Sequence, residues 1–132
     1  MKNLTTNTNT NTNTDTDNKG AKGKIGENLA SLFLIKNSYD ILESNFYSRY
    51  GEIDIIAKKG DLIVFAEVKY RKNDYHSTPS MAVNTKKQEK IKKTALKYIS
   101  DNNITNKDFR FDIIEIVGIG ELKVNHIENA FC

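Results

Sequence analysis

The chain has 132 residues, enough for one domain with a buried core, and a net charge of +3 from 20 basic and 17 acidic side chains. It contains no apolar run near the roughly 20 residues of a membrane span, and its start lacks the apolar segment of a secretory signal. We therefore expect a cytoplasmic protein without membrane contact. A single cysteine, Cys132, excludes an internal disulfide and a cysteine-rich zinc site.

Residues 1–18 are dominated by an alternation of Thr and Asn and contain almost no apolar side chain. Such a segment cannot bury enough surface to offset the entropy lost on ordering. This composition predicts a disordered tail over residues 1–18, followed by a folded domain over residues 19–132.

A helix is predicted from about Lys22 to Lys36. Its apolar stripe at helical spacing consists of Ile25, Leu29, Leu32 and Phe33. Glu27 lies on the other side of this helix, together with Ala30 and Leu34, so a second face is also expected to be covered. Its position alone favours a solvated glutamate over a ligand.

Three strands are predicted next, over Tyr39–Tyr47, Gly51–Lys58 and Leu62–Tyr70. The last two form a hairpin, in which Gly60 supplies the positive φ that a tight turn needs. The apolar residues of the two hairpin strands must share one face of the sheet, which restricts the register of their pairing.

Acidic residues interrupt both hairpin strands. If Gly60 and Asp61 form a two-residue loop, Asp54 lies opposite Glu67 and Glu52 lies opposite Lys69. A loop longer by two residues makes Asp54 and Glu67 diagonal neighbours. In either register the two carboxylates share one face, and Glu67 and Lys69 point the same way.

Two such carboxylates repel each other and are costly to bury without a counter-charge. A divalent cation resolves this conflict, and ligands that are all oxygen suit Mg²⁺ or Mn²⁺. Lys69 would lie beside the metal, able to orient water or to stabilise charge on a phosphate. The alternative is an ordinary hairpin with a Glu–Lys pair at a solvent-exposed edge.

A polar loop over residues 72–80 follows, and its pattern favours a plain surface loop over a substrate contact. A second helix is predicted from Thr85 to Asp101, with Thr85 and Gln88 as a capping box. Its buried stripe consists of Ile91, Ala95, Tyr98 and Ile99, extended back one turn by Lys87 and Gln88. Its lysines are Lys86, Lys87, Lys90, Lys92, Lys93 and Lys97. A solvated face is the ordinary interpretation, but a surface of one sign also suits a phosphate backbone.

Two final strands are predicted over Phe109–Val117 and Glu121–Ile127. Asp112 and Glu115 are interpreted as charges at a strand end or sheet edge, and His126 as a packed or edge histidine. The order is therefore α-β-β-β-α-β-β. Apolar residues on both sides of the central strands predict an α/β fold whose sheet is covered by helices on both faces.

This order, with its acidic strands and basic helix, resembles the restriction-endonuclease-like core of the PD-(D/E)xK nucleases. Asp54 matches the family's metal-binding aspartate, and Glu67-Val68-Lys69 matches its (D/E)xK motif. Glu27 matches the acidic residue that many members carry in the first helix. Lys87 or Gln88 falls where some members place a further polar residue. Ile53 stands where the motif has its proline.

A second resemblance covers nearly all of the chain after the tail. The segments GKIGENLA, GEID, FAEVKYR, AVNTKKQEKI and NAF occur in the order and spacing of the bacterial YraN family of small uncharacterised proteins. Members of that family are assigned by similarity to the endonuclease-like fold, with no proven substrate or activity. The resemblance implies that Glu27 is a site residue rather than a solvated glutamate.

The leading hypothesis is an endonuclease-like protein that depends on Mg²⁺ or Mn²⁺ and hydrolyses phosphodiesters in DNA, including branched or single-stranded structures. Metal ligands would be Asp54, Glu67 and Glu27, with the Ala66 or Val68 carbonyl as a further oxygen. Lys69 would position the attacking water or stabilise the phosphorane, and Glu52 would orient Lys69. The candidate contacts to nucleic acid are Arg49, Lys87, Gln88 and Lys90. Cutting both strands of a junction would require two sites, as in a homodimer.

Two other classes of function fit the same residues. A non-catalytic nucleic-acid-binding module would keep the fold and the basic helix, and would bind DNA without metal in a salt-sensitive way. A protein-interaction domain would use the acids of the hairpin only as structural residues. The three hypotheses differ in whether DNA binding and cleavage depend on Asp54 and Glu67.

Overall fold

The computed structural model describes residues 15–72 and 83–132. Most of the predicted tail, and most of the loop predicted over residues 72–80, lie outside the described residues. The described elements follow the predicted order α-β-β-β-α-β-β, which is confirmed. They are α2 (Asp15–Lys36), β1 (Asp40–Ser48), β2 (Gly51–Lys59), β3 (Leu62–Arg71), α3 (Thr85–Asp101), β4 (Asp108–Val117) and β5 (Lys123–Phe131).

Two element bounds differ clearly from those predicted. Helix α2 begins at Asp15 rather than at Lys22, so the last residues assigned to the tail are helical. Strand β5 ends at Phe131 rather than at Ile127. The polar composition of both segments hid their regular structure, because neither shows a clear apolar period.

The predicted capping box of α3 was wrong, although the bounds of the helix were predicted correctly. The N-cap is Asn84, whose side chain accepts a hydrogen bond from the Lys87 N–H at 2.8 Å. The Gln88 side chain instead donates to the Val83 carbonyl at 2.9 Å. Asn is as good an N-cap as Thr, so the sequence admitted either residue.

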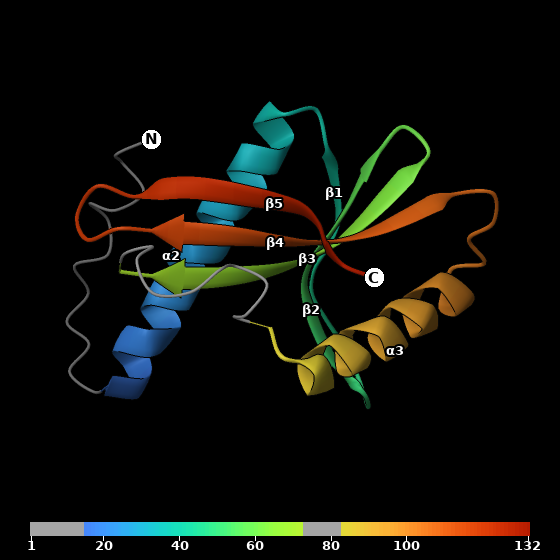
Figure 1. Ribbon diagram of the computed structural model, residues 1–132, viewed down its shortest axis with the longest axis horizontal. Helices are drawn as coiled ribbons and strands as arrows, with labels where there is room; N and C mark the ends of the chain where they lie inside the picture. Colours follow the sequence, from blue (N-terminus) through green and yellow to red (C-terminus); the bar gives the residue numbers. More distant parts are fainter. Residues whose placement is uncertain (1–14, 73–82) are drawn as a thin grey trace.

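The five strands form one mixed sheet in the order β1-β2-β3-β4-β5. Strands β3 and β4 are parallel and are joined through α3, whereas the other neighbours are antiparallel. Helix α2 lies against one face of the sheet and α3 against the other (Figure 1), which confirms the predicted cover on both faces. In the strand order, β3 is the central strand of the sheet.

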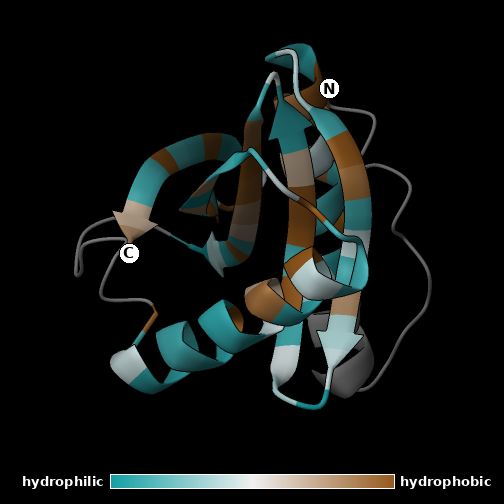
Figure 2. Ribbon diagram, turned by 90° about the vertical axis from the view of Figure 1, so that its right-hand side faces the viewer, coloured by the Kyte–Doolittle hydropathy of each residue, from teal (hydrophilic) through white to brown (hydrophobic). Residues whose placement is uncertain are grey.

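Each face of the sheet has its own apolar cluster. The cluster against α2 includes Leu29, Ala30, Leu34, Ile55, Val64, Ala66, Ile114 and Ile116. The cluster against α3 includes Ile53, Ile56, Ile63, Phe65, Ile91, Ala95, Tyr98 and Ile113. Figure 2 shows the result, with hydrophobic strands behind a largely hydrophilic α3. No helix among the described residues combines the length and the apolar character needed to cross a membrane.

The buried face of α2 differs from the predicted stripe. Ala30 and Leu34 are fully buried, whereas Leu32 is 41% exposed. Helix α2 therefore turns toward the sheet the side that also carries Glu27. Leu29 of the predicted stripe is buried as well, so the expected cover of a second face is confirmed and only part of the main stripe is wrong.

Asp112 and Glu115 are fully buried, so their interpretation as edge charges was wrong. The Asp112 carboxylate accepts two hydrogen bonds from Arg110 at 2.8 Å and one from the backbone N–H of Asn129 at 2.9 Å, and His126 Nε2 lies 2.7 Å away. Burial alone would raise the pKa of Asp112, but the hydrogen bonds from His126 and Arg110 lower it below the ordinary value. The packed position predicted for His126 is confirmed.

The hydrogen bonds of Asp112 with Arg110, His126 and Asn129 stabilise an irregular part of the sheet. The pairing of β4 with β5 shifts register between Phe111 and Ile113, and Asn129 adopts a positive φ of 54°. Arg110 also donates to the Tyr39 hydroxyl at 2.8 Å, which connects β4 to the start of β1. One carboxylate thus accepts hydrogen bonds from β4 and β5, and its partner Arg110 extends the network to Tyr39.

We expect Asp112→Ala to lower the free energy of unfolding by about 3–5 kcal/mol at pH 7, because it leaves buried donors of Arg110 and His126 without their acceptor. Urea unfolding followed by circular dichroism measures this loss. The matched control is Asp108→Ala, which removes an exposed aspartate from the same strand.

The loss caused by Asp112→Ala should depend on pH. The folded-state pKa of Asp112 is lowered, so its stabilisation is complete above the unfolded-state pKa of about 4 and is lost as the pH falls toward the folded-state pKa. A destabilisation no larger than that of the control at pH 7 would contradict the assigned role.

Candidate functional site

The candidate site forms where β2 separates from β3. Their pairing runs from Lys59–Leu62 to Ile55–Ala66, which is the register predicted for the two-residue loop, and Gly60 has the expected positive φ of 61°. The ladder ends one residue short of Asp54 and Glu67. Beyond that point β2 turns toward α3 while β3 continues beside β4 (Figure 1).

Because the two strands diverge, neither Asp54–Glu67 nor Glu52–Lys69 forms a ladder pair, contrary to the predicted extension of the hairpin. The Asp54 carboxylate instead accepts a hydrogen bond from the backbone N–H of Val68 at 2.8 Å. A side chain of β2 thus takes the place of its backbone in bonding to β3. This contact holds Asp54 beside the middle of the (D/E)xK segment.

Glu67 lies on the central strand with 5% of its side chain exposed. Its Oε2 atom is 3.0 Å from Lys87 Nζ and 3.5 Å from Lys69 Nζ. The contact with Lys69 confirms that the two side chains share one face of β3. Glu67 is buried on the central strand, so this contact does not lie at a solvent-exposed edge.

The carboxyl group of Asp54 is electrostatically unfavourable in its ionised form. Burial and, next to it, the charge of Glu67 raise its pKa to about 7, although the hydrogen bond from Val68 partly opposes this. The charges of Glu27 and Glu52 act in the same direction as Glu67. The site therefore contains more negative charge than its hydrogen bonds satisfy.

Lys87 is the cation closest to these acids. Burial tends to lower its pKa, but the charge of Glu67 and the hydrogen bond to it raise the pKa above its ordinary value, with smaller contributions from Asp54 and Glu52. Helix α3 places Lys87 in its first turn, on the side that continues the stripe of Ile91 toward the sheet. The prediction that Lys87 extends this stripe is thus confirmed.

Glu27 reaches the site from the opposite face of the sheet. Gly26 is buried against Val68 and Ile116, where an added Cβ would lie 3.5 Å from Ile116 and 3.8 Å from Val68, so α2 approaches the strands closely. The effect of Glu27 on the pKa of Asp54 places it within electrostatic range. Across residues 15–72 and 83–132, however, no three His, Cys, Asp or Glu side chains gather closely enough to hold one metal ion.

The donors of the site nevertheless fit a hard divalent cation. Mg²⁺ is commonly bound through one or two carboxylates and keeps several waters, so it does not require a cage of protein ligands. Asp54 and Glu67 supply two carboxylates, and the raised pKa of Asp54 shows that negative charge there lacks compensation. In this structure, the Lys87 ammonium forms an ion pair with one carboxylate oxygen of Glu67.

Glu115 is a neighbouring residue that sequence reasoning missed. It is fully buried, pairs in register with Lys69 on the adjacent strand, and its Oε2 atom lies 3.1 Å from Arg71 Nε. Its Oε1 atom accepts a hydrogen bond from Asn125 at 3.2 Å. The sequence could have indicated this burial, because Glu115 is a single acid between two isoleucines, and a continuous apolar run is typical of a buried strand.

The four predicted contacts to nucleic acid fall in different places. Lys87 lies at the acids, and Gln88 bonds to the backbone before α3. Lys90 is exposed on α3, and its Cβ lies 3.5 Å from the position that a Cβ on Gly51 would take. Arg49 lies in the turn between β1 and β2, where it donates to the Tyr50 hydroxyl at 2.7 Å. Arg49 and Lys90 are thus part of a surface separate from the acids.

The sequence matches a known family over the part that builds this site. The model of UPF0102, an uncharacterised protein family, matches residues 26–116, which include Glu27, Asp54, Glu67 and Lys69. The chain belongs to the UPF0102 family. The resemblance noted above under the name YraN is therefore confirmed.

Relatives in this family match over most of their length. A UPF0102 protein of Alkaliphilus metalliredigens is 41% identical over 83% of this chain and 96% of its own length. One of Thermodesulfovibrio yellowstonii is 50% identical over 83% of this chain and 94% of its own. One of Caldicellulosiruptor bescii is 50% identical over 83% of this chain and 95% of its own.

We expect Asp54→Asn to stabilise the protein at pH 8 in the presence of EDTA. Because the folded-state pKa of about 7 lies above that of the unfolded chain, the folded state binds more protons, and wild-type stability falls as the pH rises from about 4 to about 7. The amide can still accept the hydrogen bond from Val68 but carries no charge. The gain at pH 8 should be on the order of 2 kcal/mol and should vanish near pH 4.

Thermal unfolding at pH 4, 6 and 8 measures this difference, with Asp40→Asn as the control for loss of an exposed carboxylate from the adjacent strand. A variant that is less stable than wild type at pH 8 would contradict the inferred charge imbalance.

Proposed function

We propose that this UPF0102 protein is a metal-dependent nuclease that hydrolyses phosphodiester bonds in DNA. The observation that carries the proposal is the pair Asp54 and Glu67, held at the divergence of two strands with Lys69 and Lys87 against Glu67. Acids of this kind cost stability, and charge imbalance of this kind is typical of functional sites. The expected role in the cytoplasm is part of the same proposal.

Asp54 and Glu67 would hold Mg²⁺ or Mn²⁺, with the Ala66 or Val68 carbonyl as a further oxygen donor and Glu27 available through a water. A bound divalent cation would supply Lewis-acid stabilisation of phosphate charge and make a water molecule more acidic. The Lys69 side chain is about one-third exposed and lies on the same face of β3 as the side chain of Glu67. Its ammonium can donate to a phosphate oxygen or hold the attacking water in line.

Positive charge near the acids supports DNA as the substrate. Lys86, Lys90 and Lys93 lie on α3 without a carboxylate within 4.0 Å among the described residues. An unbalanced row of lysines attracts a phosphate backbone and releases its counterions. The row begins one residue before Lys87, so bound DNA would approach the acids.

A non-catalytic DNA-binding module is the second candidate, and one contact favours it. The 3.0 Å ion pair between Lys87 and Glu67 already compensates part of the negative charge without any metal. In that case the acids would serve to position Lys87, and the basic row of α3 would account for all DNA binding.

Cleavage of labelled duplex, single-stranded and four-way-junction DNA distinguishes these candidates. We expect cutting with Mg²⁺ or Mn²⁺, none with EDTA, and a loss of at least about 100-fold in both Asp54→Asn and Glu67→Gln. The matched control is Asp40→Asn, which should cut like wild type. DNA binding without cutting, equal in all four proteins, would overturn the nuclease proposal in favour of the binding module.

Lys87→Met should bind Mn²⁺ more tightly than wild type, by several-fold or more, because it removes the cation that competes for Glu67. Isothermal titration calorimetry at constant pH measures the affinity. Lys86→Met is the control, since it removes an exposed lysine from the same turn without touching Glu67. An equal effect of both variants would mean that only the overall charge matters and that Lys87 does not occupy the metal position.

A further inference from the structure

A second recess lies beside α3, away from the acids. It is a pocket of about 390 Å³ lined by Tyr50, Lys93, Leu96 and Lys97. Leu96 is 65% exposed, although large apolar side chains on a helix normally face the core. The recess thus combines an aromatic ring and an apolar side chain with two cations, and none of these residues has a part in the proposed chemistry.

A hydrogen bond connects the turn that carries Tyr50 to helix α3. Ser48 Oγ lies 3.2 Å from Thr94 Oγ1 of α3, and the backbone N–H of Tyr50 donates to the same Ser48 oxygen at 3.0 Å. Gly51 follows with a φ of 151°, a conformation that side chains disfavour, and it allows close approach to Lys90. The backbone of Tyr50 is therefore held beside α3, and its side chain lines the pocket together with residues of that helix.

Positive charge surrounds this ring. The Arg49 guanidinium lies 4.9 Å from the centroid of Tyr50 and donates to its hydroxyl. The pKa of Tyr50 is lowered, mainly by that hydrogen bond and also by the charges of Arg49, Lys93 and Lys97. Lys97 pairs with Asp101 at 3.1 Å, whereas Arg49 and Lys93 have no carboxylate within 4.0 Å in the described part of the chain.

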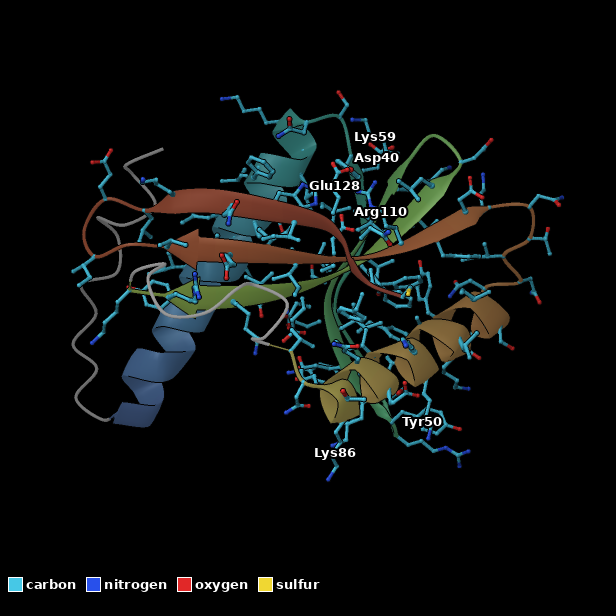
Figure 3. The ribbon with its side chains drawn as sticks, in the orientation of Figure 1. Asp40, Tyr50, Lys59, Lys86, Arg110 and Glu128 are labelled. Carbon is cyan, nitrogen blue, oxygen red and sulfur yellow. The ribbon has the colours of Figure 1, made fainter. Side chains whose placement is uncertain are left out.

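The pocket lies on the path that leads to the acids. Lys86, Lys90, Lys93 and Lys97 are spaced along one side of α3, and Figure 3 shows Lys86 and Tyr50 along the same outer edge of the molecule. A rise of 1.5 Å per residue puts the lysines of the pocket about 9–15 Å along the helix from Lys87. At the 3.4 Å of helix axis per phosphate that one strand has in duplex DNA, this length corresponds to about three to four phosphates.

We propose that this pocket holds an unpaired base of a single-stranded DNA segment, stacked on Tyr50, with its flanking phosphates on Arg49, Lys93 and Lys97. Aromatic stacking combined with a basic groove is how proteins bind single strands without sequence preference. A duplex cannot use the pocket unless a base leaves its stack. The inference rests on the proposed binding of DNA, and it defines the substrate class as DNA with an unpaired segment a few nucleotides from the bond that is cut.

Fluorescence anisotropy in EDTA tests the pocket without requiring cleavage. Full-length wild type, Tyr50→Ala and Tyr50→Phe are titrated against a single-stranded oligonucleotide and against the same sequence as a duplex. We expect Tyr50→Ala to weaken single-strand binding about tenfold or more and to leave duplex binding nearly unchanged. Tyr50→Phe keeps the ring and should stay within about threefold of wild type.

The matched control is Tyr47→Ala, which removes a tyrosine that is 68% exposed on β1 and does not line the pocket. Circular dichroism establishes that each variant is folded. A 2-aminopurine placed in the single strand should lose fluorescence on binding to wild type and keep it with Tyr50→Ala.

Two results would overturn the inference, and they differ in what else they affect. If Tyr50→Ala weakens single-strand and duplex binding equally, or changes neither, the pocket is not a base site, while the nuclease proposal stands. If wild type binds neither DNA, the proposed function and the inference fail together. Lys93→Glu compared with Lys36→Glu, a lysine at the end of α2, separates the charge of the pocket from charge elsewhere.

Discussion

Two acidic side chains, Asp54 and Glu67, lie close together where β2 diverges from β3. The positions of the residues around them depend on the repulsion between these two acids. Asp54 accepts a hydrogen bond from the backbone of Val68, its one donor among the described residues, and faces the charge of Glu67. Glu67 lies on the central strand with only 5% of its side chain exposed, so solvent gives its charge little relief. Lys69 from the same strand and Lys87 from α3 supply the compensation, and both contact Glu67 rather than Asp54. The charge of Asp54 is therefore the one that the proposed function assigns to a bound cation.

Asp112 and Asp54 differ in how many hydrogen-bond donors their carboxylates have. Asp112 has donors from Arg110, His126 and Asn129, and its pKa is lowered. Asp54 is half-buried, and its pKa is raised to about 7. Both are aspartates within predominantly apolar strands, so composition cannot separate them. Their different surroundings indicate that Asp112 contributes stability and that Asp54 costs it, which is the usual relation between a structural acid and a functional one.

Helix α3 connects the two regions that carry the functional proposals. Its inner side packs Ile91, Ala95 and Tyr98 on the sheet, its first turn delivers Lys87 to Glu67, and its outer side carries lysines toward Tyr50. One helix can therefore align a phosphate backbone between a base-sized recess and a pair of acids. The UPF0102 relatives match this chain over most of their length, so the same combination can be sought in them.

The sequence by itself determined the order of elements, the bounds of α3 and the sharing of one face by Glu67 and Lys69, because these depend on local periodicity and turn chemistry. It restricted the hairpin to two registers, of which the structure selects that of the two-residue loop. Only the tertiary structure decided how far each side of α2 is buried, and that Glu27 lies within electrostatic range of Asp54. It also decided that β2 diverges from β3, that Asp112 and Glu115 are buried, and that Tyr50 meets Lys93. These features depend on contacts between segments far apart in the chain, which no local pattern records.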